Sequence, residues 1–74
     1  MRPEEVLALA NDLVNNPLLE YILTRIEDDA VLAMATAVDR QDFAEFQAVY
    51  RGAQRLRSDL LMLIEEARRE IENG

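Results

Sequence analysis

The stretch FAEFQAVYRGAQRLRSDLLMLIEEARREI, residues 43–71, decides the fold. Mostly apolar residues recur in it at alternating spacings of three and four, which is the a/d pattern of a helix that packs along one side. We call this line of residues the seam. These positions are Phe43, Phe46, Tyr50, Ala53, Arg57, Leu60, Ile64, Ala67 and Ile71. A second apolar stripe, Val49, Leu56 and Leu63, repeats every seven residues beside the seam. The width of the combined surface predicts a long helix over residues 40–72 that packs in a bundle.

Two residues depart from this pattern. Arg57 occupies a seam position, where a charge is costly unless it is paired or reaches water. We expect it to form an ion pair with Glu27 or Asp28 that fixes register or oligomeric state, the alternative being a basic side chain presented at a pore or interface. Gly52 lies inside the helix at a cost of about 1 kcal/mol relative to alanine. It indicates either close approach of another backbone or a kink.

Two shorter helices are predicted upstream. An apolar stripe at helical spacing begins near Pro3, a residue suited to a first helical turn, and predicts a helix over residues 3–15. The sequence Asn15-Asn16-Pro17 ends that helix and begins the next, with Asn16 as N-cap and Pro17 as first helical residue. The second helix is predicted over residues 17–38, and its alanine-rich second half would let a neighbouring helix approach closely.

The apolar pattern breaks at residues 39–42. Asp39 is suited to cap a new helix, with Asp42 in the capping-box place, and we interpret the break as a tight turn. One continuous helix is the alternative, because no Gly or Pro interrupts the segment. The predicted fold is therefore all-α and a single small domain over residues 1–74: a short N-terminal helix followed by a helical hairpin whose second arm is long and heptad-patterned.

The charge distribution is uneven. The chain has 74 residues, 15 of them acidic and eight Arg, for a formal net charge of −7. Residues 1–50 carry this excess, so the first two thirds should repel nucleic acid and attract basic partners. The candidate acidic partner face is Glu27, Asp28, Asp29 and Asp42. The candidate register or nucleic-acid contacts are Arg51, Arg55 and Arg57. Ordinary solvated ion pairs are the simpler interpretation of these arginines, and direct nucleic-acid binding is not expected.

The residue types present argue against catalysis. The chain has no Cys and no His, which removes thiolate and imidazole chemistry, and its carboxylate pairs do not form a di-metal pattern. We expect no catalytic residue, no metal and no cofactor. No apolar run approaches the ~20 residues that span a bilayer, and no export signal is visible. The expected location is the cytoplasm, or the virion if a phage encodes the chain.

Several of these residues resemble one type of protein. Asn16-Pro17-Leu18-Leu19-Glu20, then Ile26-Glu27, a short break, and an arm with Tyr50, Arg55, Leu56, Arg57 and Leu60-Leu61 are similar to small helical proteins of tailed phages. Those proteins are found among structural and packaging genes. The resemblance covers residues 15–70 and departs at Arg51-Gly52-Ala53, where the others have a longer aliphatic run. It implies an accessory of virion assembly or DNA packaging and transfers no active site.

Three functions follow as hypotheses. The first is a non-enzymatic subunit, similar to the oligomerisation core of a small terminase, that associates with itself and with another protein. Its predicted interface is Phe43, Phe46, Tyr50, Leu60, Ile64 and Ile71. The second is an acidic phage anti-defence inhibitor that occupies a basic channel of a host nuclease complex. The third is a cellular coiled-coil adaptor.

Overall fold

The protein consists of three helices joined by two short breaks. A computed structural model describes all residues, 1–74, and contains α1 (Pro3–Val14), α2 (Pro17–Thr36) and α3 (Arg40–Asn73), with no strand. The predicted all-α fold, a short first helix and a hairpin with a long last arm, is confirmed. The helix ends differ slightly from the predicted ones: α1 stops one residue earlier, α2 two residues earlier, and α3 continues one residue further.

Side-chain caps begin α2 and α3. The Asn16 side-chain oxygen accepts hydrogen bonds from the backbone N–H groups of Leu18 and Leu19, at 2.8 and 3.4 Å. Asp39 accepts one from the N–H of Asp42 at 2.8 Å. Each cap satisfies donors that the first helical turn leaves free. The predicted turn is confirmed, and the alternative of one continuous helix is wrong, because residues 37–39 are not helical.

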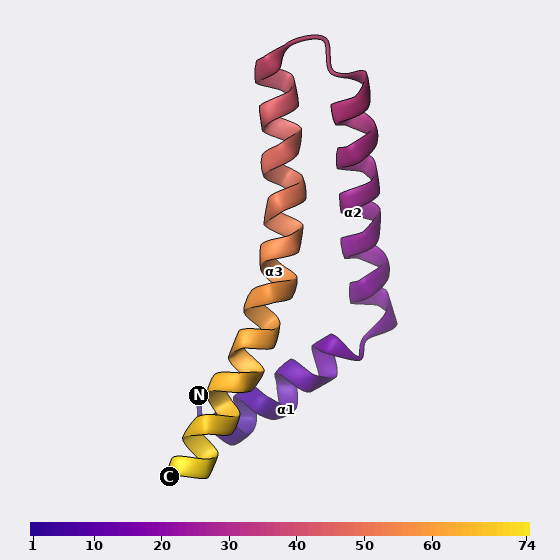
Figure 1. The fold of residues 1–74 in the computed structure, drawn as a ribbon. Helices are drawn as coiled ribbons and strands as arrows, with labels where there is room; N and C mark the ends of the chain where they lie inside the picture. Colours follow the sequence, from indigo (N-terminus) through magenta and orange to yellow (C-terminus); the bar gives the residue numbers. More distant parts are fainter.

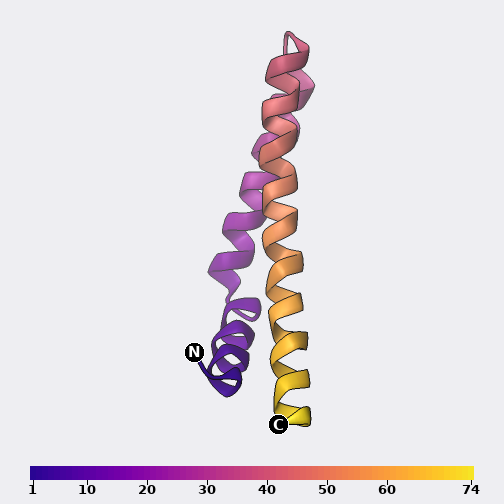
Figure 2. The ribbon, with the colours of Figure 1, turned by 90° about the vertical axis from the view of Figure 1, so that its left-hand side faces the viewer.

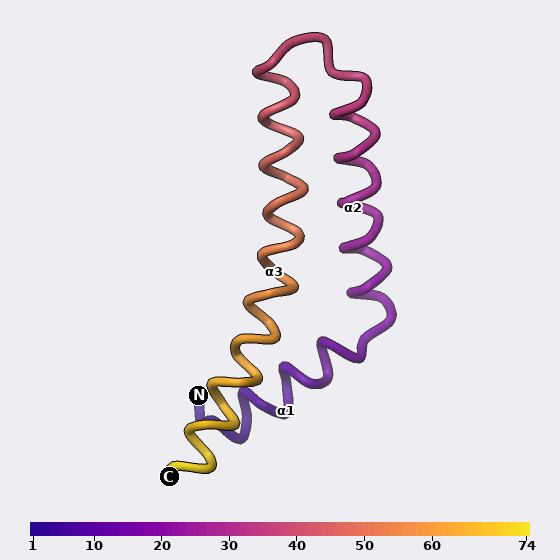
Figure 3. Tube along the Cα trace, viewed as in Figure 1, coloured from indigo at the N-terminus to yellow at the C-terminus, as the bar shows by residue number.

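The long helix α3 runs along the whole length of the molecule, and the other two helices pack against it. With 34 residues it has a length of about 51 Å, close to the longest dimension of the protein, 53 Å. α2 lies along its first half and α1 along its second, and these two shorter helices contact each other little (Figure 1). The trace in Figure 3 shows the bend between α1 and α2, and both chain ends lie at the same end of the molecule. Seen from the side, α1 sits beside the lower part of α3 (Figure 2).

The buried core is narrow and built largely from alanine. Only six residues are buried, and Leu23 and Ile64 are the only large side chains among them; the others are Ala10, Ala30, Ala53 and Ala67. Small side chains let helices pack closely but remove little apolar surface from water. The seam of α3 is therefore covered by two short helices in series, and each contributes only a few buried side chains.

Candidate protein-interaction site

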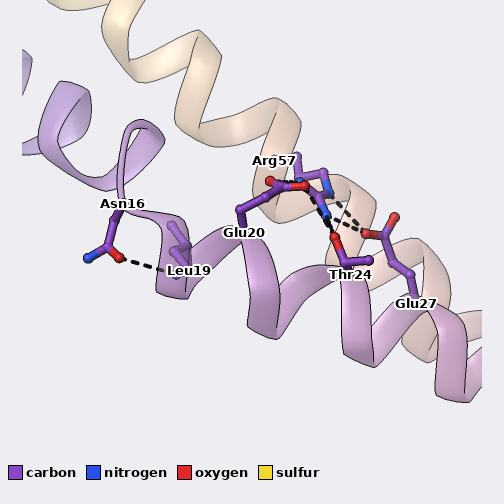
Figure 4. A network of polar contacts seen from close by, with 6 residues as sticks. All are labelled: Asn16, Leu19, Glu20, Thr24, Glu27 and Arg57. Atoms are coloured by element: carbon purple, nitrogen blue, oxygen red, sulfur yellow. Dashed lines mark hydrogen bonds and ion pairs between the residues drawn. The ribbon is translucent and has the colours of Figure 1, made fainter.

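A polar cluster centred on Arg57 joins α3 to α2 (Figure 4). Nε and Nη2 of Arg57 donate to one carboxylate oxygen of Glu27 at 3.0 and 2.6 Å. Nη1 donates to Glu20 at 2.5 Å, and Nη2 also reaches the hydroxyl of Thr24 at 3.3 Å. Thr24 in turn donates to Glu20 at 3.2 Å. One guanidinium thus holds three side chains of α2 together.

The spacing of the α2 residues explains the cluster. Glu20, Thr24 and Glu27 follow one another at intervals of four and three residues, which places them on one face of a helix. Arg57 comes from the seam position of α3 that faces them. Its planar guanidinium offers five N–H donors in fixed directions, so it can serve several acceptors at once. The cluster therefore connects α3 to one face of α2 at a defined position along both helices.

The cluster changes the proton affinity of two of its members. The hydrogen bond from Arg57 holds the pKa of the Glu20 carboxyl below its ordinary value; loss of water opposes this, and Thr24 adds to it. The hydrogen bonds to Glu20 and then to Glu27 raise the pKa of Arg57. Glu27 is the best shielded, with 17% of its side chain exposed, against 61% for Glu20. The pair of Arg57 with Glu20 is therefore the more open to salt and water.

One of the two predicted partners of Arg57 is correct. The ion pair with Glu27 is confirmed, whereas Asp28 is exposed and takes no part in the cluster. Glu20 and Thr24 were missed. A signal for them exists in the sequence, because both share a helix face with Glu27.

The remaining charged candidates do not gather into one site. Arg51 and Arg55 are exposed, and Arg55 approaches Asp59 on its own helix at 3.5 Å, so neither joins Arg57. Among the acids, Glu27 faces Arg57 while Asp28 and Asp29 are exposed on α2. Asp42 lies in the first turn of the other helix. Nowhere do three or more acidic side chains come together as a metal-binding group.

The six predicted interface residues are buried within the chain to different degrees. Ile64 is buried, and Tyr50 and Leu60 are half-buried. The other three, Phe43, Phe46 and Ile71, lie toward the two ends of α3 and keep more than a third of their surface exposed. The seam thus serves first as the contact of α3 with α1 and α2, and its most exposed apolar residues lie toward its ends.

An apolar hollow of about 200 Å³ lies where the three helices meet. Its lining is apolar apart from the ion-paired side chains of Glu20 and Arg57 at one edge. The residues that line it are Leu13, Val14, Leu19, Glu20, Leu23, Arg57, Leu60 and Leu61. Leu13, Val14 and Leu61 are themselves exposed, so the core is open to water at this junction.

Apolar surface is exposed along the whole molecule. The accessible surface is 5854 Å², whereas a compact monomer of 8.5 kDa exposes about 4,700 Å². Nineteen large apolar residues are exposed, including Ile22, Ile26, Val49 and Leu56. No helix is both long and apolar enough to cross a bilayer.

Comparisons of the chain with protein-family models, with curated proteins and with solved structures found no match. The class that the fold defines is accordingly an all-α protein with a long helical spine and an incompletely covered apolar surface.

Proposed function

We propose that this protein is a non-enzymatic interaction module that associates with itself through apolar helix surfaces. One observation carries the proposal: six residues are buried, while nineteen large apolar side chains remain exposed. Isolated exposed apolar residues are normal, but a surface excess of roughly 1,200 Å² in so small a chain is typical of a protein that needs a partner.

The assembled form would act in virion assembly or DNA packaging, in the manner of a small-terminase oligomerisation core. The resemblance of residues 15–70 to small helical phage proteins is the support for this role. The exposed arginines are few and separate, and the net charge is −7. The proposed contacts are therefore with protein, first with copies of the same chain and then with another assembly component.

Size-exclusion chromatography with light scattering tests self-association. We expect a mass of at least two chains at micromolar concentration, and a single-chain mass throughout that range would refute the proposal. Affinity purification from infected cells then tests the assembly role. Recovery of capsid, portal or large-terminase subunits would support it, and recovery of host nuclease subunits instead would contradict it.

The acidic-inhibitor alternative has one observation in its favour: Asp28 and Asp29 are exposed and unpaired on α2, within the acidic two thirds of the chain. Salt separates the two functions. Self-association of an acidic chain should strengthen as salt screens the repulsion between copies, whereas binding to a basic channel should weaken. The cellular-adaptor hypothesis stays a prediction that the coding neighbourhood of the gene would test.

A further inference from the structure

One flank of the hairpin formed by α2 and α3 is apolar and uncovered. We define the Leu56 flank as Ile22 and Ile26 of α2 together with Val49, Gly52 and Leu56 of α3. Its four large side chains are each between 38% and 50% exposed. On α3, the three members of the flank lie at spacings of three and four, and the two on α2 lie four apart, so each group shares a helix face.

Helix geometry places both halves of this flank on the same side of the hairpin. Leu56 and Ile26 each precede a member of the cross-helix ion pair, Arg57 and Glu27, by one residue. One residue is a rotation of about 100° around the helix axis. Because the helices are antiparallel, the same rotation carries both side chains to the same side, away from the ion pair. The hairpin thus has the ion pair on one flank and these exposed apolar side chains on the other, where Asp29 also lies one turn beyond Ile26.

Gly52 gives a second, independent observation on this flank. Glycine in the interior of an exposed helix is destabilising, and close approach of another backbone is one reason for its presence. Within the chain no such reason exists, because a Cβ added at Gly52 would meet no atom within 4 Å. The helix also continues through this position with no break. Packing within the chain therefore does not explain the residue, and the alternative of a kink stays a prediction.

We propose that the Leu56 flank is the contact between two copies of this chain, with α3 helices crossing at Gly52. This inference rests on the proposed function and assigns it to one surface. The excess surface of roughly 1,200 Å² per chain belongs to the whole molecule; two copies that covered all of it would bury about 2,400 Å², the size of a permanent homodimer interface, and the flank supplies part of that area. Permanent homodimer interfaces are more hydrophobic than transient ones, and the large side chains of the flank are apolar.

The pattern of α3 fits a second copy as the occupant. Val49 and Leu56 belong to a seven-residue repeat that continues to Leu63, and helices with the same repeat can pack along it. In a twofold dimer the same patch serves both copies, so glycines near the axis would face each other and let the helices approach. The only acid of α3 between Val49 and Leu63, Asp59, is paired with Arg55, which lessens repulsion there.

Sedimentation equilibrium of the full chain and three variants tests the assignment. Leu56→Glu adds a charge to the flank, and Gly52→Ala adds one methyl group at the crossing. Val31→Glu is the matched control, because Val31 is also 50% exposed but lies one turn beyond Glu27, on the flank of the ion pair. We expect the dimer dissociation constant to rise about tenfold or more for Leu56→Glu and measurably for Gly52→Ala, and to stay unchanged for Val31→Glu.

Gly52→Ala keeps the test decisive if Leu56→Glu fails to fold. Alanine favours helix formation, so a variant exposed to water would be at least as helical as the wild type. Weaker association, with helix content unchanged at concentrations where both chains are dimeric, would therefore support the crossing; far-UV circular dichroism measures the helix content. A dimer unaffected by both flank variants would overturn the assignment and leave the proposed function standing. A wild-type chain that stays monomeric would overturn both.

Discussion

Arg57 shows how one charged residue in an apolar seam can favour one register of α2 along α3. A heptad position normally takes an apolar side chain, and a charge there is tolerated only where acceptors surround it. Glu20, Thr24 and Glu27 supply those acceptors from one face of α2. A shift of α2 by one turn would leave the guanidinium without its full set of partners, so the cluster favours one register over its neighbours.

Replacement of Arg57 tests this role. Arg57→Ala should lower the melting temperature, because it leaves Glu27 poorly hydrated and without its cation. Arg55→Ala is the matched control, since Arg55 is 82% exposed and its only ion pair lies within α3. We expect little change for the control, measured by thermal denaturation followed by circular dichroism. Equal effects of the two substitutions would show that the cluster does not hold the helices.

The lowered pKa of Glu20 predicts an acid sensitivity. A carboxyl whose pKa is lower in the folded state stabilises the fold above its ordinary pKa and loses that contribution as the pH falls through its folded value. The loss should set in as the pH falls through the ordinary glutamate pKa of 4.5 and continue toward the lower folded value. On acidification through that range, Glu20→Gln should therefore lose less stability than the wild type in urea unfolding. Identical losses would contradict the lowered pKa.

At the scale of the helices, local chemistry predicts where each begins. Asn16 with Pro17 and Asp39 are recognisable caps, and both act as caps in the structure. The ends are harder to predict, because no glycine or proline stops α2 after Thr36. Final helical turns without such a stop depend on tertiary contacts, which a single sequence does not reveal.

The seam of α3 was predictable as a surface, but its partners were not. Its spacing indicates which side of the helix is apolar, and Ile64, Ala53 and Ala67 are indeed buried. The spacing does not indicate that α2 covers one half and α1 the other. That division depends on the bend at Asn16, whose direction is set by packing.

Truncating seam side chains to alanine should lower the stability by amounts that depend on how well α1 or α2 covers each position. Ile64 is 8% exposed where α1 covers α3, and Ile64→Ala should destabilise the protein by roughly 2–5 kcal/mol. Phe43 is 44% exposed near the turn, and its truncation should cost less. Urea unfolding measures both, with Leu32→Ala as an exposed control on α2. Equal tolerance at all three positions would mean that the seam is not a core.

At the scale of the whole molecule, the shape is too extended for the chain length. The radius of gyration is 16.1 Å, against about 11 Å for a compact domain of this size. A core of four alanines and two large side chains supplies little of the hydrophobic stabilisation that a small domain needs. A second copy would provide the missing apolar contacts, so folding and association should be coupled.

The coupling is tested by the melting temperature of the wild-type chain as a function of its own concentration. When the folded species is a dimer and the unfolded species a single chain, mass action stabilises the dimer as concentration rises. Over about a hundredfold range in the micromolar region, circular dichroism should record a steady rise in the melting temperature. A melting temperature that stays constant over that range would mean that the single chain folds on its own.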